Sequence, residues 1–172
     1  AALAKTGNTV TCLDIDPGKV ALLRQGTSPF YEPGLSELLT QNIEAGRLHF
    51  TDDRAAAYAD AEVIFICVGT PTGDDERCDL TAVLAVADDI AANMPGHDPV
   101  VVVKSTVPVG TTKRIAERIS GGTTQPFHIA NNPEFLREGN ALDDFMRPDR
   151  IVCGTDSREA ETRLRAVYEP FT

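Results

Sequence analysis

The stretch VIFICVGTPT, residues Val63–Thr72, decides the fold. Its first six residues are apolar without interruption, which is typical of a strand buried on both faces of a parallel sheet. Gly69, Thr70 and Pro71 then supply a tight turn and a hydroxyl. In open α/β folds, ligands bind at the carboxyl ends of such strands. The stretch therefore predicts a central strand with polar groups at its end, although a plain turn after a strand also accounts for it.

Similar apolar runs lie on both sides of this stretch and alternate with segments of helical composition. The strands that we predict are Thr9–Asp14, Arg47–Thr51, Val63–Val68, Val100–Ser105, His128–Asn131 and Arg150–Gly154. The helices that we predict are Ala1–Lys5, Lys19–Gln25, Gly34–Ala45, Leu80–Asn93, Thr111–Ile119 and Arg158–Val167. Asp79 is the expected N-cap of the helix that starts at Leu80. This alternation indicates an α/β fold with a doubly wound, mostly parallel sheet covered by helices on both faces.

Composition limits the classes of partner. The chain has 16 Lys and Arg against 26 Asp and Glu, a formal net charge of -10, which disfavours long-range attraction to nucleic acid. A small phosphate ligand is still compatible, because backbone N–H groups at helix N-termini bind anions whatever the net charge. The longest apolar runs are far shorter than the ~18 residues that indicate a membrane span. We therefore expect neither a nucleic acid nor a membrane as partner.

The four cysteines are widely spaced and form no CxxC pair or other metal-ligand pattern: Cys12, Cys67, Cys78 and Cys153. Three of them lie in apolar, strand-like surroundings. Buried free thiols in a reducing compartment are the simplest interpretation. We therefore predict no metal site and a cytoplasmic location.

Asp14 ends the predicted strand Thr9–Asp14 and is the first candidate for ligand binding. In a dinucleotide-binding βαβ unit, an acid at the tip of the second strand accepts hydrogen bonds from the adenosine ribose and disfavours the extra phosphate of NADP. That interpretation predicts NAD. A solvated Asp at a strand end, with Asp16 capping the helix near Pro17, explains the local sequence equally well. The glycine-rich turn that would decide between them would lie before Ala1.

Two further predicted strands end in polar residues. Ser105 and Thr106 follow one of them directly, and a simple helix cap accounts for Thr111 more easily than for these two. Glu134 and Glu138 follow the other strand and lie four residues apart. Such a pair of carboxylates can divide acid–base and water-orienting roles, although ordinary surface charges on an exposed turn are an equal alternative. Together with Val63–Thr72, these strand ends predict a site for a polar ligand.

Six segments, in order along the chain, resemble the UDP-glucose/GDP-mannose dehydrogenase family. They are LDIDPGKV (Leu13–Val20), YEPGL (Tyr31–Leu35), FICVGTPT (Phe65–Thr72), KSTVPVGT (Lys104–Thr111), NPEFLREGNA (Asn132–Ala141) and DFMRPDRIV (Asp144–Val152). The resemblance implies that residues 1–172 form part of a Rossmann-like NAD-binding domain whose first strand is missing. It also implies that the central helix and a C-terminal UDP-sugar-binding domain are absent. The full-length form is expected to be a homodimer, and this chain alone is not expected to complete the reaction.

The resemblance implies a reaction and a role for each motif residue. The enzyme would oxidise UDP-glucose twice with NAD, through a cysteine-bound thioester, to UDP-glucuronate. Oxidation of GDP-mannose or UDP-N-acetylmannosamine, or a non-catalytic nucleotide-binding module, are the alternatives. The catalytic residues implied are Glu134 as general acid–base, with Thr106 and Glu138. The cofactor-binding residues implied are Asp14, Lys19, Val68, Gly69, Thr70, Pro71, Thr72, Ser105, Thr106, Val107 and Glu138. The substrate-binding residues implied are Glu134, Phe135, Leu136, Arg137 and Glu138.

Overall fold

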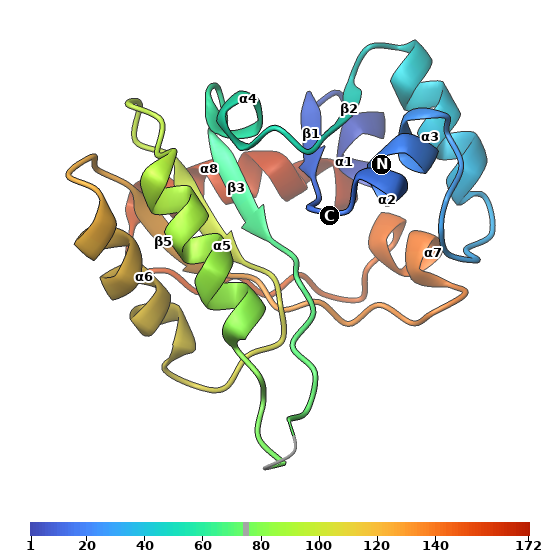
Figure 1. Ribbon diagram of the computed structural model, residues 1–172. Coiled ribbons are helices and arrows are strands. Elements are labelled where there is room, and N and C mark those ends of the chain that lie inside the picture. Colours follow the sequence, from blue (N-terminus) through green and yellow to red (C-terminus); the bar gives the residue numbers. More distant parts are fainter. Residues whose placement is uncertain (74–75) are drawn as a thin grey trace. The chain divides into compact units, whose positions relative to one another are not determined.

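The computed structural model describes residues 1–73 and 76–172 and confirms the α/β class (Figure 1). Strands and helices alternate along most of the chain. They are α1 (Ala2–Lys5), β1 (Val10–Leu13), α2 (Pro17–Arg24), α3 (Leu35–Glu44), β2 (Leu48–Thr51), α4 (Arg54–Tyr58), β3 (Val63–Ile66), α5 (Thr81–Ala92), β4 (Val100–Val103), α6 (Thr111–Gly122), β5 (His128–Asn131), α7 (Ala141–Met146), α8 (Arg158–Tyr168) and the 3-10 turn η1 (Glu169–Phe171).

The strands form two separate parallel ladders. In one, β1 pairs with β2; in the other, β4 lies between β3 and β5. The chain also divides into two compact units. Unit 1 contains residues 1–57, 135–150 and 166–172, and unit 2 contains residues 58–134 and 151–165. The sequence predicted a mostly parallel sheet, and every pairing within the two ladders is parallel.

Each unit has its own apolar core. In unit 1 the core contains Ala4, Val20 and Leu39 from three helices, and Leu48 and Phe50 from β2. In unit 2 the four side chains of β4 are all fully buried. Figure 1 shows α5 and α6 on one face of this sheet and α8 on the other. Helices therefore cover both faces of the β3–β4–β5 sheet, as predicted for a strand that is apolar on both sides.

One predicted strand is wrong. Residues Arg150–Gly154 form no ladder; only Gly154 bridges to β5, in antiparallel orientation, through two 2.8 Å backbone hydrogen bonds to Asn131. On either side of this bridge, side chains rather than backbone N–H groups donate to the backbone carbonyls of the neighbouring segment. Asn132 donates its side-chain amide to the carbonyl of Val152 at 2.8 Å, and the Thr155 hydroxyl donates to the carbonyl of Ile129 at 2.7 Å.

The boundaries of other elements also differ from the prediction. Strand β4 ends at Val103, because the N–H groups of Lys104 and Ser105 both donate to the carbonyl of Ile66 and so interrupt the ladder. Helix α5 begins at Thr81 with Leu80 at its N-cap position, although the Asp79 carboxylate accepts the N–H of Thr81 at 2.8 Å, as a cap would. Helices α4 and α7 were not predicted. None of the helices in the described ranges has the length and apolar character that crossing a membrane requires.

Helices α5 and α6 pack closely because Gly122 has no side chain. A Cβ atom at Gly122 would lie 2.9 Å from the Cβ of Ala91, which is shorter than two carbon atoms tolerate. The guanidinium of Arg118 also contacts both carboxylate oxygens of Asp88 at 2.6 Å, so the two helices are linked outside the core as well.

We expect Gly122→Ala to destabilise the protein by about 1–3 kcal/mol, because the added methyl group must push two packed helices apart. Gly121→Ala is the matched control, since a Cβ there meets no heavy atom within 4 Å. The control should be neutral or more stable by about 0.5–1 kcal/mol, because alanine favours helix over glycine. Urea denaturation measures both, and equal stability of the two variants would contradict this account of the packing.

Candidate functional site

In unit 1, Asp14 follows β1 directly and forms an ion pair with Lys19. The Nζ atom of Lys19 lies 2.6 Å from Oδ2 of Asp14, and the N–H of Asp16 donates to Oδ1 at 3.0 Å. About a third of each charged side chain is exposed. Burial raises the pKa of Asp14, but the hydrogen bonds from Lys19 and Asp16 outweigh it and hold that pKa below its ordinary value. Asp14 is therefore a partly exposed carboxylate, charged at neutral pH, at the end of a strand.

The capping role that the sequence offered for Asp16 is confirmed. Asp16 is the N-cap of α2, and its carboxylate accepts hydrogen bonds from the N–H groups of Gly18 at 2.8 Å and Lys19 at 3.1 Å. The capping role and the strand-end role thus belong to two different acids, because Asp14 points its carboxylate at the Lys19 ammonium instead. Asp14 therefore takes no part in capping α2 with its side chain, and the ion pair with Lys19 orients its carboxylate.

In unit 2, the loops after β3 and β4 brace each other at the carboxyl end of the sheet. The buried hydroxyl of Ser105 donates to the carbonyl of Val68 at 2.7 Å. In the opposite direction, the hydroxyl of Thr70 donates to the carbonyl of Thr106 at 2.8 Å. The structure therefore brings the predicted Val68–Thr72 and Ser105–Val107 residues together. The Ser105 hydroxyl holds the loops, whereas Thr106 is exposed.

Lys104 lies at the centre of this edge, a position that we did not predict from the sequence motif. It follows the last residue of β4, the middle strand of three. Its Nζ atom lies 3.5 Å from Oδ1 of Asn132, a buried side chain that is 2% exposed. The sequence did contain a signal for this position, because Lys104 directly follows four consecutive valines. A strand that is apolar on both faces lies in the interior of a sheet, so the residue that follows it is expected to be partly buried.

Burial lowers the pKa of Lys104, while the nearby groups Cys67, Glu134 and Cys153 act in the opposite direction. Glu134 is half-buried, so the predicted acid–base residue has a lysine as its electrostatic neighbour. Among the described residues no cysteine forms a disulfide, but the predicted burial is wrong: Cys12 and Cys78 are half-buried, and Cys67 and Cys153 are exposed. Cys67 and Cys153 both lie outside the strands, Cys67 directly after β3 and Cys153 beside the bridge between Asn131 and Gly154, which explains their exposure.

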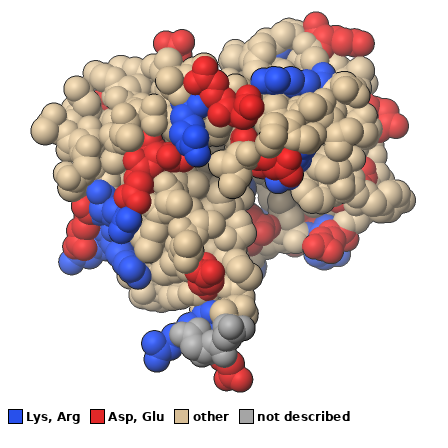
Figure 2. Space-filling model, viewed as in Figure 1, with Lys and Arg blue, Asp and Glu red and all other residues tan. Residues whose placement is uncertain are grey.

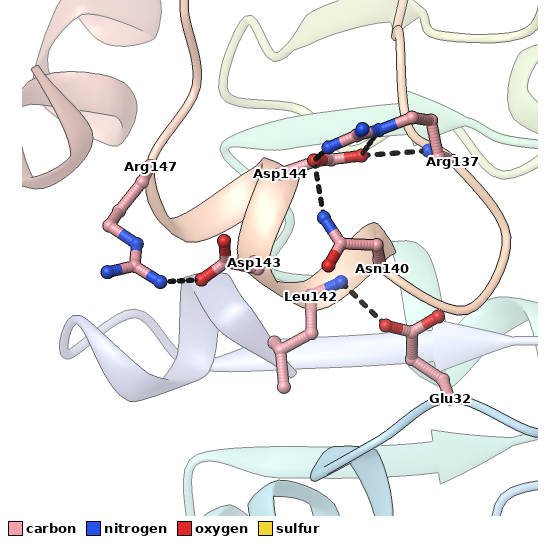
Figure 3. A network of polar contacts seen from close by, with 7 residues as sticks. All are labelled: Glu32, Arg137, Asn140, Leu142, Asp143, Asp144 and Arg147. Atoms are coloured by element: carbon pink, nitrogen blue, oxygen red, sulfur yellow. Dashed lines mark hydrogen bonds and ion pairs between the residues drawn. The ribbon is translucent and has the colours of Figure 1, made fainter.

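The remaining predicted residues, Phe135–Glu138, lie in unit 1 and are exposed. They precede α7 without regular helix, and the ring of Phe135 faces the guanidinium of Arg150 at 5.1 Å. The guanidinium of Arg137 is held by Asp144, as Figure 3 shows. Within residues 1–73 and 76–172, no group of His, Cys, Asp and Glu side chains is arranged to hold a metal ion.

Comparison with known proteins identifies relatives over the whole chain. The model of the UDP-glucose/GDP-mannose dehydrogenase family, NAD binding domain, matches residues 1–172. UDP-glucose 6-dehydrogenase of Pseudomonas aeruginosa is 47% identical over 99% of this chain, and that of Rhizobium meliloti is 48% identical over 98%. The chain spans 39% of the length of each of these two relatives.

Solved structures agree with this similarity. A UDP-glucose dehydrogenase from Pyrobaculum islandicum has a TM-score of 0.96 and 40% identity, covering 99% of this chain and 40% of that one. A GDP-mannose dehydrogenase from Pseudomonas aeruginosa has a TM-score of 0.94 and 34% identity, covering 97% of this chain and 40% of that one.

The burial of Lys104 predicts a pH dependence of stability. Its lowered pKa means that the folded protein releases this proton at a lower pH than the unfolded chain does. Between the two pKa values the unfolded chain binds more protons, so the free energy of unfolding rises with pH. We expect the free energy of unfolding of the wild type to rise relative to that of Lys104→Met as the pH rises toward about 10.4, the ordinary pKa of lysine.

Urea denaturation from neutral to alkaline pH measures this difference. Lys113→Met is the control, because the Lys113 side chain is 83% exposed and its removal should leave the shape of the curve unchanged. Parallel curves for wild type and Lys104→Met would contradict the assigned burial.

Proposed function

The chain belongs to the UDP-glucose/GDP-mannose dehydrogenase family, whose NAD binding domain it forms, and on that premise we propose its reaction. The chain supplies the NAD site and the acid–base residues of an enzyme that oxidises UDP-glucose to UDP-glucuronate. One observation carries this choice of substrate: 47% identity to a UDP-glucose 6-dehydrogenase across 99% of the chain. The 34% identity to a GDP-mannose dehydrogenase makes GDP-mannose the second candidate substrate.

Bound NAD would supply the hydride acceptor that both oxidations at C6 of the sugar require. We assign Glu134 to the proton transfers, because it is half-buried at the carboxyl edge of the sheet with Lys104 as neighbour. The exposed Thr106 hydroxyl at the same edge would orient the water that releases the product. Glu138 and its neighbours Phe135–Arg137 would contact cofactor, water or nucleotide sugar.

For cofactor binding, we assign Asp14 to the adenosine ribose and Lys19 to holding it in place. The carboxylate can accept hydrogen bonds from both ribose hydroxyls, and its charge repels the 2′-phosphate of NADP. Residues 68–72 and 105–107 would line the cofactor's path toward the nicotinamide. The hydroxyls of Thr70 and Ser105 already donate to carbonyl groups, so these two hydroxyls could only accept hydrogen bonds from the cofactor.

We assign the thioester cysteine to none of the four thiols of this chain, because none lies in the family's glycine-rich context. A thioester cannot form without its thiol, so residues 1–172 alone would not complete the reaction. In this proposal the chain is part of a longer cytoplasmic protein. Its central helix and C-terminal domain supply the remaining residues and the contacts of a homodimer.

Glu134→Gln tests the acid–base assignment in the protein that contains this chain. We expect turnover of UDP-glucose to fall by about 10²–10⁴-fold, because general acid–base catalysis contributes that much. Calorimetry with NAD should show unchanged cofactor binding. The control is Glu117→Gln, which makes the same change at an exposed position on α6.

Unchanged turnover of the Glu134→Gln variant would remove Glu134 from the mechanism. Assays of the wild type with UDP-glucose, GDP-mannose and UDP-N-acetylmannosamine decide the substrate, and turnover of the second or third alone would overturn the proposed one. Binding of both NAD and a nucleotide sugar without turnover of any would instead favour a non-catalytic nucleotide-binding module.

Asp14→Asn tests the cofactor assignment. We expect NAD affinity to fall about tenfold or more, since a hydrogen bond to a charged group contributes about 1.5–3 kcal/mol. Discrimination against NADP should narrow in the same variant, because the repelling charge is gone. Calorimetry with both cofactors measures this, with Asp52→Asn as a charge-matched control after the neighbouring strand β2. An unchanged NAD to NADP affinity ratio would contradict the role of Asp14.

A further inference from the structure

We infer that Asp144 is a positioning residue for nucleotide-sugar binding: it fixes the turn that carries Arg137 and Glu138, and Glu32 anchors that turn within unit 1. The inference rests on the proposed function, because it takes Arg137 and Glu138 to face the sugar nucleotide. Glu32 belongs to the YEPGL motif, Tyr31–Leu35, to which the proposed reaction assigns no role.

The Asp144 carboxylate accepts hydrogen bonds from four donors of the turn, and Figure 3 shows these residues together. Its Oδ2 accepts hydrogen bonds from the backbone N–H and from Nε of Arg137, both at 3.0 Å. Its Oδ1 accepts from Nη2 of Arg137 at 2.5 Å and from the side-chain amide of Asn140 at 2.8 Å. The carboxylate therefore fixes the backbone and the side chain of Arg137 together.

The turn itself is tight and depends on this anchor. The N–H of Asn140 donates to the carbonyl of Arg137 at 3.0 Å, and Gly139 has a φ of +78°, which favours glycine. Asp144 stands one helical turn later, and its own N–H donates to the carbonyl of Asn140 at 3.0 Å. Loss of the carboxylate would leave Glu138 on a turn closed by backbone hydrogen bonds alone.

Glu32 provides the second anchor. Helix α7 begins after Asn140, whose side chain binds Asp144 and makes no cap hydrogen bond. Instead the Glu32 carboxylate, 110 residues away in sequence, accepts the N–H of Leu142 at 3.0 Å. Gly34 belongs to the same motif, and a Cβ there would lie 3.5 Å from the Leu142 side chain. The motif thus caps and packs against the first turn of α7 (Figure 3).

The exposure of the ion pair indicates which partner faces a ligand. The side chain of Asp144 is 16% exposed, whereas that of Arg137 is 74% exposed. The guanidinium contacts with Asp144 use Nε and Nη2 and do not use Nη1. A guanidinium already held in one orientation loses less rotamer freedom when it binds a diphosphate or a sugar hydroxyl. Asp144 therefore increases affinity without touching the ligand.

This contribution should be independent of pH in the neutral range. The hydrogen bonds from Arg137 hold the pKa of Asp144 well below its usual range. A carboxylate with a lowered pKa loses its stabilising contribution only as pH falls toward that pKa. Asp144 stays charged throughout any assay near neutral pH, unlike a group that exchanges protons during turnover.

The test uses Asp144→Asn in the protein that contains this chain. We expect KM for the nucleotide sugar to rise about tenfold, a larger factor than the change in kcat or in NAD affinity. The KM ratio to wild type should be constant from about pH 6 to pH 9. Asp144→Glu keeps the carboxylate and should recover part of the affinity. Asp143→Asn is the matched control, because Asp143 lies in the same helical turn but pairs with Arg147.

Hydrogen exchange gives a second readout that does not depend on turnover. Asp144→Asn should speed exchange of the Arg137 amide, and Glu32→Gln should speed exchange of the Leu142 amide and raise KM by a smaller factor. Equal KM values for Asp144→Asn and Asp143→Asn would overturn the inference while leaving the proposed function intact. A parallel loss of NAD affinity and thermal stability would also overturn it, as a purely structural role. A wild type that turns over no nucleotide sugar would refute both proposals.

Discussion

The buried strand β4 is the constraint on which the candidate site depends. Its four valines have no exposed surface, and its register places Val103 beside Ile66 on β3 and Asn131 on β5. Exposing any of them would cost about 1.5–3 kcal/mol, so the end of the strand is held in place. Lys104 follows this strand directly, so its charged side chain is partly buried at the edge of the sheet. The polar character of the site therefore follows from an apolar strand that ends beneath it.

The loops at this edge are stabilised by side chains that bind backbone carbonyls. Ser105 reaches across to Val68, and Thr70 reaches back to Thr106. Asn132 joins the Lys104 ammonium to the segment after residue 150. Among the described residues, no buried side-chain nitrogen or oxygen lacks a hydrogen-bond partner. A network satisfied in this way is rigid, which is what a site must be if it binds a cofactor without reorganising.

The sequence predicts the parts of this structure that depend on local pattern. The apolar runs at Val63 and Val100 identify the strands β3 and β4, and the position of Asp14 at the end of a strand is confirmed. The antiparallel bridge at Gly154 and the helix α7 were missed, because both depend on partners distant in sequence. The apolar residues of Arg150–Gly154 suggested a strand, but the side chains of Asn132 and Thr155 make hydrogen bonds where a ladder would have backbone pairs. Helix α7 has no buried residue and is capped from Glu32, so it shows no apolar stripe and no local cap.

The chain has a formal net charge of -10, yet both of its proposed ligands, NAD and a nucleotide sugar, carry a negatively charged diphosphate. Long-range attraction cannot assist, and at physiological salt it is screened beyond about 8 Å in any case. Binding must come from donors in contact with the ligand. Lys19 and Arg137 are each held by one carboxylate, Asp14 and Asp144, that fixes the cation and cancels its distant field. The net negative charge therefore disfavours large polyanions, whereas in our proposal the oriented Arg137 guanidinium would still bind a small anion that fits against it.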